Sequence, residues 1–370
     1  MAPSPASFAA DQGLLEAARR GDEGAYASLV EPHRRELHAH CYRMLGSVHD
    51  AEDALQDALL RAWRGLPRFD GRSSLRSWLY AIATNTSLDA IQKRKRRVLP
   101  FDHTGPTDPK DGWGEPPTET VWIEPYPDQV FVEEDGLVQP EARFERRESV
   151  ELAFIAALQH LPANQRAALI MKEVLGFSAQ EVADAMDTTV QSVNSALQRA
   201  RKTVDEKLPE RSQQANLRSV GDERVREVVQ RYMDAMARFD VDAVVGMLAE
   251  EAAWSMPPLP VWFDGRDAIR GFLARGPLSG EWQWKHLHTT VNGQPASAAY
   301  CHHPQFGDFR PFALDVLTLD GERIRSVTSF VVRDTPVKDR DFYERWPEKD
   351  ADTERLREAF AAFGLPERLG

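Results

Sequence analysis

The sequence contains 370 residues, of which 42% are hydrophobic, and it carries a formal net charge of −12 at pH 7. This length predicts two or three domains, each large enough for a core of its own. No apolar run approaches the ~20 residues that a membrane-spanning helix needs, and the first residues lack the basic start and apolar stretch of a secretory signal. The negative charge argues against a protein that coats DNA unaided.

The two cysteines, Cys41 and Cys301, stand far apart and outside any CxxC or Cys/His cluster. Thiols in this arrangement are predicted to be buried or incidental in a reducing cytoplasm. The sequence therefore predicts a cytoplasmic protein that does not engage a membrane and has neither a metal site nor a cofactor.

Residues 11–97 are predicted to be helical, because their apolar residues recur every three or four positions. One stripe runs from Leu55 to Leu66 and another from Leu75 to Ile82, and "LPRFDGRSSLRSW" between them predicts a loop that ends in a serine helix cap. Leu14–Arg97 holds fifteen Lys/Arg and eleven Asp/Glu, so this segment is basic within an acidic chain.

Residues 98–140 change character, with ten Asp/Glu against the single Lys110 and many prolines and glycines. No period is sustained, so they are predicted to form an extended acidic linker that is ordered only when bound. The stretch "WIEPYPD" is more aromatic than a spacer needs, and part of it is predicted to dock on another surface.

Helical patterning resumes over residues 141–208. Here "FSAQEVADAMDTTVQSVNSALQRARKTV" divides into a short helix, a tight turn around Asp187–Thr189 and a second helix. This layout is typical of a helix-turn-helix, whose second helix would enter the DNA major groove.

A second linker, "PERSQQANLRSVGDE", is predicted to precede a domain at residues 219–335. That domain begins with two helices joined at Asp240, followed by alternating segments that read as strands. Helices followed by strands predict an α+β domain with a curved antiparallel sheet. The charged tail, residues 336–370, contains a predicted helix over "DTERLREAFAAF".

The stretch Asp50–Arg97, "DAEDALQDALLRAWRGLPRFDGRSSLRSWLYAIATNTSLDAIQKRKRR", closely resembles region 2 of sigma-70 family RNA polymerase sigma factors of the extracytoplasmic-function (ECF) group. Leu161–Val204, "LPANQRAALIMKEVLGFSAQEVADAMDTTVQSVNSALQRARKTV", is similar to region 4 of the same group. On its layout and on "WSMPP…FDGRDAIRGFL", the last domain is similar to SnoaL-like members of the NTF2-like superfamily.

The resemblance implies a multidomain fold with two all-α sigma domains followed by an α+β NTF2-like cone. Region 2 would be a helical bundle at residues 11–97, and region 4 the helix-turn-helix at residues 141–208. It also implies a sigma factor that binds core RNA polymerase at the β′ clamp helices and the β flap, recognises the −35 and −10 promoter elements and assists promoter melting. The SnoaL-like domain would regulate activity through intramolecular contacts with the sigma domains, and no enzymatic activity is expected.

The helix at Asp50–Trp63 presents Asp50, Asp53 and Asp57 on one side, which by charge alone is an ordinary solvated acidic face. With the resemblance, Asp53, Gln56 and Asp57 are implied to dock on the polymerase clamp helices.

The loop at residues 69–74 and the helix after it would open and read the −10 element, because promoter melting requires an unstacked base to be held in a pocket. The side-chain amide of Asn85 can hydrogen-bond to a base edge, although a local hydrogen bond within the helix is the simpler role for an asparagine. The residues implied to contact the −10 DNA are Arg72, Ser73, Ser74, Asn85, Lys93, Arg94 and Arg96.

In the second helix of the helix-turn-helix, the outward side chains would read the −35 element, because Asn and Gln can pair bidentately with adenine. The candidates are Gln191, Asn194, Ser195, Gln198, Arg199 and Lys202. Positions that are often basic in relatives are Asn194 and Ala196 here, so the promoter preference cannot be copied from them. The acidic linker either mimics nucleic acid in the polymerase cleft, with Glu133, Glu134 and Asp135 as its densest patch, or is a self-extending spacer.

The last domain shows a candidate small-molecule pocket, comprising Trp254, Trp262, Phe263, Asp264 and His286. Isomerase or cyclase activity would need a carboxylate or histidine base, for which Asp264, His286, His288, His302 and Asp315 are available, but no spacing forces two of them into one site. The aromatic residues are as easily explained as core. An alternative interpretation of the whole chain is a helix-turn-helix repressor with a ligand-binding domain. This interpretation assigns no function to residues 50–97.

Overall fold

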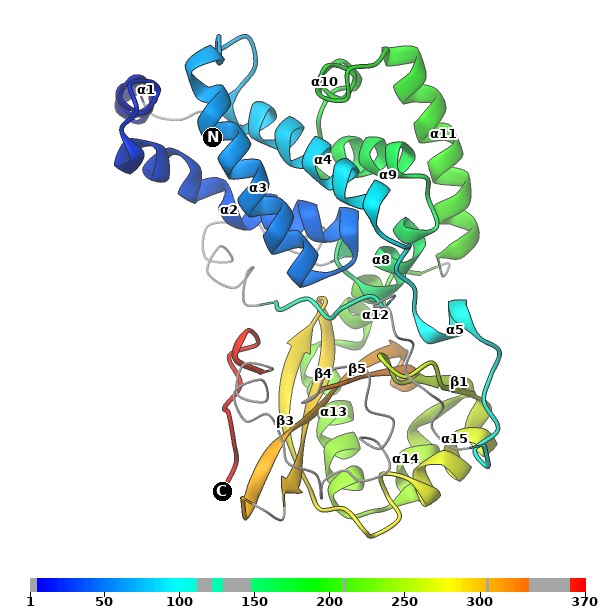
Figure 1. The fold of residues 1–370 in the computed structure, drawn as a ribbon. Coiled ribbons are helices and arrows are strands. Elements are labelled where there is room, and N and C mark those ends of the chain that lie inside the picture. The colour runs from blue at the N-terminus through cyan, green and yellow to red at the C-terminus, as the bar shows by residue number, and fades with distance from the viewer. Residues whose placement is uncertain (1–4, 112–121, 129–147, 209–210, 304–305, 333–359) are drawn as a thin grey trace. The chain divides into compact units, whose positions relative to one another are not determined.

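The computed structural model (Figure 1) describes residues 5–111, 122–128, 148–208, 211–303, 306–332 and 360–370. The chain divides into two compact units. The helical unit comprises residues 1–96 and 157–207, and the sheet unit comprises residues 97–156 and 208–370. None of the helices in the described ranges is long and apolar enough to cross a membrane.

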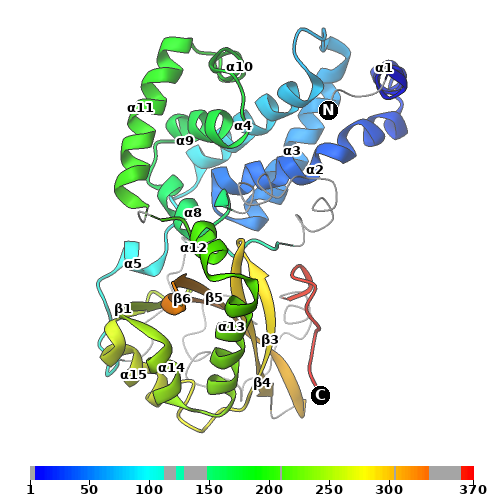
Figure 2. The ribbon, with the colours of Figure 1, turned by 180° about the vertical axis from the view of Figure 1, so that it is seen from behind.

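The helical unit is built from two groups of helices (Figures 1 and 2). The first group comprises α1 (Pro5–Arg19), α2 (Glu23–Leu45), α3 (Val48–Gly65) and α4 (Leu75–Lys93). The second comprises α8 (Leu152–Gln159), which begins in the sheet unit, α9 (Ala163–Leu169), a π-helical turn (Ile170–Val174), α10 (Ala179–Ala185) and α11 (Val190–Lys207).

Local chemistry explains where the first helices begin. Ser47 and Ser74 accept hydrogen bonds from Asp50 N and Ser77 N, at 3.1 and 3.0 Å, and so cap α3 and α4. The predicted serine cap after the loop is thus confirmed. Each cap satisfies one of the backbone N–H groups that a helix start leaves without a partner.

The two helix groups pack on each other inside the helical unit. α2, α3 and α4 contact one another, and α4 also contacts α9 and α10. Arg166 of α9 is buried and donates to Met44 O of α2, and Thr84 of α4 donates to Met171 Sδ at 3.7 Å. The expected helix-turn-helix is present, with α10 and α11 joined through Asp187, whose φ is 49°.

The sheet unit holds a six-stranded sheet and the helices that pack on it. Its helices are α5 (Pro100–His103), α12 (Gln213–Val220), α13 (Asp222–Ala237), α14 (Val241–Met247) and α15 (Gly265–Arg275). Its strands are β1 (Leu248–Ser255), β2 (Trp262–Asp264), β3 (Trp284–Val291), β4 (Gln294–His303), β5 (Asp308–Asp320) and β6 (Arg323–Val331). α13 packs against β3 and β4, and α15 packs against β1 and β2 (Figure 2). Asp240 caps α14, at the predicted junction of two helices.

The sheet is mixed, which corrects the antiparallel expectation. The strand order is β2-β1-β6-β5-β4-β3, and β1 pairs with β6 in parallel. Alternating side chains predict where strands lie but not which strands pair. β3, β4, β5 and β6 alternate in direction, and β6 then lies beside β1 and runs in the same direction as β1. The short strand β2 also escaped prediction.

The prediction of a second linker at residues 209–223 is wrong in part, because residues 213–220 form the helix α12. Ser212 caps this helix by accepting from Ala215 N at 3.2 Å. Its buried positions are amides, Gln213, Gln214 and Asn216, which bond to the backbone of the sheet rather than packing as an apolar stripe. A helix that buries polar side chains has no hydrophobic period to reveal it. The helix predicted over residues 352–363 lies outside the described residues up to position 359.

Candidate functional site

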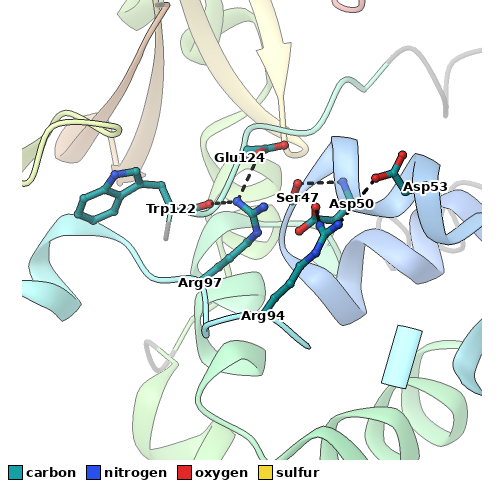
Figure 3. A network of polar contacts seen from close by, with 7 residues as sticks. All are labelled: Ser47, Asp50, Asp53, Arg94, Arg97, Trp122 and Glu124. Carbon is teal, nitrogen blue, oxygen red and sulfur yellow. Dashed lines mark hydrogen bonds and ion pairs between the residues drawn. The ribbon is translucent and has the colours of Figure 1, made fainter. Parts of the chain in front are cut away.

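The acidic face of α3 is exposed at Asp53, Gln56 and Asp57. Asp50 does not belong to this face, which corrects the expected grouping, since it is 8% exposed and forms an ion pair with Arg94. Arg94 also reaches Asp53, at 3.8 Å (Figure 3). The arginine expected to contact DNA phosphates therefore lies against the acidic side chains expected to meet the polymerase.

The other predicted −10 side chains surround the start and end of α4. Arg72, with a side chain 90% exposed, pairs with Asp70 in the loop, beside the exposed Ser73 and the capping Ser74. At the far end Lys93 is exposed and Arg96 donates to His160 Nδ1, at 2.9 Å. These cations are accessible, but the structure does not gather them around one point.

Asn85 lies on an exposed side of α4, and its side-chain amide already makes a hydrogen bond within the protein. Its Nδ2 donates to the backbone oxygen of Ala185 in α10, at 3.2 Å. About two turns earlier on α4, Ser77 Oγ donates to Glu181 of α10, at 3.4 Å. The face of α4 predicted to read a promoter base thus contacts the first helix of the helix-turn-helix.

The predicted outward face of α11 is exposed. Gln191, Asn194, Gln198, Arg199 and Lys202 are exposed and Ser195 is half-buried, whereas Val193 and Leu197 are buried on the opposite side. A free row of amides and cations on the second helix suits contact with base edges and phosphates.

The aromatic end of the acidic linker is docked within the sheet unit, which confirms that prediction for "WIEPYPD". Trp122, Ile123 and Tyr126 are buried. Arg97 is also buried, and it donates to Trp122 O at 2.7 Å and pairs with Glu124 at 3.3 Å (Figure 3). The acidic patch at Glu133, Glu134 and Asp135 lies outside the described residues, so its mimicry of nucleic acid stays a prediction.

The turn between β3 and β4, Asn292–Gly293, contacts the linker and also the chain that follows the linker. Asn292 is completely buried; its Oδ1 accepts from Tyr126 N and its Nδ2 donates to Val150 O, each at 2.7 Å. Gly293 N donates to Asp128 Oδ1, at 2.8 Å. A φ of 55° at Asn292 suits an Asn-Gly hairpin turn. The sequence signals the turn but not what the asparagine side chain binds.

Leu152 and Glu151 continue this attachment beyond the linker. Leu152 N donates to Gln294 Oε1, at 3.0 Å. The Glu151 carboxylate accepts from the backbone N–H groups of Gln213 and Gln214, at 3.2 and 2.6 Å, at the start of α12. Burial raises the pKa of Glu151 to about 7, although these hydrogen bonds oppose the shift. No periodic signal marks such a buried carboxylate.

A cavity of about 90 Å³ lies inside the cone of the sheet unit. The residues lining it include five aromatic side chains and three polar ones: Trp254, Phe272, Trp282, Trp284, Phe312, His286, Asp315 and Ser329. Asp315 accepts from Tyr232 Oη at 2.9 Å and from Ser329 Oγ at 2.6 Å, and Ser329 accepts from the Trp254 indole. Burial raises the pKa of Asp315 to about 6.

The five predicted pocket residues are not brought together. Trp254 and His286 line the cavity, whereas Trp262, Phe263 and Asp264 do not. The Trp262 indole donates to Thr104 O, Phe263 stacks on Phe272, and Asp264 is exposed at the start of α15. These three are consecutive on the short edge strand β2, whereas the cavity is lined from several strands. His288 and His302, proposed as bases, do not line it either.

Three segments match known protein families. Residues 29–97 match Sigma-70 region 2, residues 151–204 match Sigma-70, region 4, and residues 229–335 match the SnoaL-like domain. The chain is 41% identical to the ECF RNA polymerase sigma factor SigG of Mycobacterium tuberculosis over 315 residues, which is 85% of this chain and 82% of the relative. It is 31% identical to the RNA polymerase sigma-H factor of Pseudomonas aeruginosa, over 54% of this chain and 93% of that protein.

Among solved structures, the crystal structure of the ECF sigma factor SigJ of Mycobacterium tuberculosis matches with a TM-score of 0.52 and 22% identity, over 82% of this chain and 96% of that one. This is a likeness of fold. The identity to SigG extends over most of both chains, and the two sigma regions occur in the expected order. The helix-turn-helix repressor alternative is therefore wrong. The chain belongs to the extracytoplasmic-function group of sigma-70 family RNA polymerase sigma factors, and it carries a SnoaL-like domain.

Proposed function

We propose that this sigma factor binds core RNA polymerase through the exposed acidic face of α3, with Asp53, Gln56 and Asp57 meeting basic groups of the β′ clamp helices. Charge complementarity of this kind steers association and sets its register. Region 4 would meet the β flap, and the complex would act on promoter DNA in the cytoplasm. The exposure of all three side chains supports this role.

For the −10 element, we propose that Asn85 binds a flipped base while the cations around α4 hold the phosphates. The Asn85 amide now donates to Ala185 O, so α10 must leave α4 before Asn85 can reach DNA. Arg94 must likewise exchange Asp50 and Asp53 for phosphate. For the −35 element, the exposed side of α11 would enter the major groove.

The SnoaL-like domain is proposed to regulate the sigma regions by holding the linker that joins them. The observation that carries this proposal is the Asn292–Gly293 turn, which binds the backbone of the linker at Tyr126 and the backbone beyond the linker at Val150, and whose Gly293 N–H donates to the Asp128 carboxylate. Linker residues attached in this way cannot extend into a polymerase channel. Release of the turn would therefore precede productive engagement.

Run-off transcription with core polymerase tests this regulation. Asn292→Gly keeps the left-handed backbone conformation and removes both side-chain hydrogen bonds, because glycine adopts positive φ without strain. We expect it to raise transcript yield several-fold, toward that of a version ending near Leu208. Asp320→Gly in the exposed β5–β6 turn is the matched control and should leave the yield unchanged.

Two results would contradict the proposal. If the full chain, Asn292→Gly and the shortened version are indistinguishable with core polymerase, intramolecular regulation is wrong. If the full chain protects specific duplex DNA without polymerase, the reading of the helix-turn-helix as a polymerase-dependent −35 module is wrong.

A further inference from the structure

The turn that holds the linker, Asn292–Gly293, is the only Asn-Gly pair in the sequence. Asparagine is a thermolabile residue, because the backbone nitrogen of the next residue can attack its side-chain amide carbon. A following glycine has no side chain to obstruct that approach. The other asparagines precede larger residues, in the pairs Asn85–Thr86, Asn164–Gln165, Asn194–Ser195 and Asn216–Leu217. The residue that binds the linker is therefore also the asparagine most open to chemical change.

The closed turn occupies both of the groups that would react. The Asn292 side chain is completely buried, and it accepts from Tyr126 N and donates to Val150 O. Gly293 N, the attacking atom, donates to Asp128 Oδ1 at 2.8 Å. An amide held at both its oxygen and its nitrogen cannot rotate toward Gly293 N. The reaction therefore requires a local opening of the turn, and the same opening frees the linker.

We propose that Asn292 is a self-modification site, at which opening of the turn permits deamidation and the product keeps the linker released. The substrate is the chain's own Asn292–Gly293 peptide, and water is the co-reactant. This inference rests on the proposed release of the turn, to which it adds a covalent and irreversible step.

The reaction is balanced without an oxidant or a reductant. Gly293 N loses its proton to hydroxide and forms a bond to Cγ of Asn292. The bond from Cγ to Nδ2 then breaks, and Nδ2 leaves as ammonia after taking a proton from water. Water opens the resulting succinimide ring at one of its two carbonyl carbons, which gives aspartate or isoaspartate.

Neither product fits the closed turn. In aspartate a carboxylate oxygen replaces the Nδ2 donor, so two acceptors would face each other where Val150 O now receives a hydrogen bond. A carboxylate at this completely buried position would also lack a positive partner among its printed contacts, Tyr126 N and Val150 O, and burying an unpaired charge is costly. Isoaspartate lengthens the backbone between positions 292 and 293, which displaces Gly293 N from Asp128.

Mass spectrometry of the full chain measures the reaction. Trypsin releases residues 286–323, in which Asn292 is the only asparagine, and a synthetic peptide of residues 288–297 serves as the open reference. When opening and closing are fast, the observed rate follows the population of the open state. We expect Asn292 to react at least about tenfold more slowly in the full chain than in the peptide, as for one or more net hydrogen bonds.

Variants test the role of the turn. Asp128→Ala removes the acceptor of Gly293 N, so it should speed the reaction several-fold toward the rate of the peptide. Asp128→Asn keeps an acceptor without the charge; it replaces the alanine variant if that variant fails to fold, and it should speed the reaction less. Asp320→Ala, in the exposed β5–β6 turn, is the matched control and should leave the rate unchanged.

Asn292→Asp represents the ordinary product. Hydrogen exchange over residues 122–128 should be about tenfold faster in this variant than in the parent, because the linker no longer stays bound to the turn.

Three results would overturn the inference: a rate in the full chain equal to that of the peptide, a rate that a folded Asp128 variant leaves unchanged, or parent-like hydrogen exchange in Asn292→Asp. All of these measurements use the full chain without polymerase. Linker regulation is judged instead by the run-off yield of Asn292→Gly, so failure of the modification site and failure of the proposed function are distinguishable.

Discussion

Arg94 and Arg97 stand three positions apart, belong to different units and have opposite environments (Figure 3). The Arg94 side chain is 45% exposed and pairs with two carboxylates of α3. The Arg97 side chain is 10% exposed and joins a backbone oxygen and a carboxylate of the linker. An exposed ion pair contributes little and exchanges readily for another charge, whereas a buried one is costly to break.

This contrast extends to the two units. In the helical unit the side chains expected to meet DNA or polymerase are exposed, and their bonds, such as Asn85 to Ala185, are single contacts at the surface. In the sheet unit, Asn292 and Asp315 are buried and make at least two hydrogen bonds each. Side chains that are proposed to change partners are thus weakly held, and side chains that hold a segment or line the cavity are strongly held.

The largest expected effect is at the linker attachment. Asn292→Ala removes two buried hydrogen bonds and places alanine at a φ of 55°, so we expect the sheet unit to lose about 3 kcal/mol of unfolding free energy. Urea unfolding followed by tryptophan fluorescence measures it. Asn292→Gly separates the two causes and should lose about half as much. Equal stability of Asn292→Ala and the parent would show that the linker is held elsewhere.

Asp315 should make the sheet unit less stable as pH rises. Its pKa is raised to about 6 in the fold, so the folded state holds the proton more tightly than the unfolded state, and the associated stability is present at low pH and lost as pH rises through 6. Relative to Asp315→Asn, the parent should lose roughly 3 kcal/mol between pH 4 and 7. Because Glu151 and His286 titrate in both proteins, the difference isolates Asp315. A difference that is constant with pH would contradict the buried carboxyl.

Arg97→Ala should destabilise the sheet unit by about 2 kcal/mol, because Trp122 O and Glu124 lose their buried partner. Differential scanning calorimetry would show the lower melting temperature. Arg97→Lys keeps the charge but not the planar donor geometry, and it should recover only part of the loss. A melting temperature unchanged by Arg97→Ala would remove the distinction between the two arginines.

The smallest effect on stability is expected at Arg94. Arg94→Ala should lower the unfolding free energy of the helical unit by about 1 kcal/mol, because the Arg94 side chain and its partner Asp53 are exposed and Asp50 is the buried partner that it leaves. We expect Arg94→Ala to change DNA binding instead. In filter binding of the polymerase complex to promoter DNA, the affinity of this variant should depend less steeply on salt concentration. A large loss of stability without any change in the salt dependence would identify Arg94 as a structural residue.

Much of the architecture could be predicted from periodicity and turn chemistry. The serine cap of α4, the helix-turn-helix around Asp187, the pair of helices joined at Asp240 and the docking of "WIEPYPD" all follow local patterns that the structure contains. The two sigma motifs were sufficient to predict the family.

What escaped prediction depends on partners distant in the chain. Asp50 looked like one of three surface acids, but Arg94, 44 positions later, pairs with it. The helix α12 buries amides on a sheet that forms only afterwards. The cavity collects Trp254, His286 and Asp315 from three strands, whereas Asp264 only neighbours a tryptophan in sequence. Contacts of this kind have no local period, so only the assembled fold reveals them.

The same hairpin turn binds the chain at two places, in the linker at Tyr126 and Asp128 and beyond the linker at Val150. Such an attachment is bivalent: while one point holds, the other stays at a high effective concentration near its partner and closes again soon after opening. Brief fluctuations of either point would therefore not free the chain. Full release would require both to open together, so under the proposed regulation the domain would respond in a near all-or-none manner to an influence that reshapes the turn.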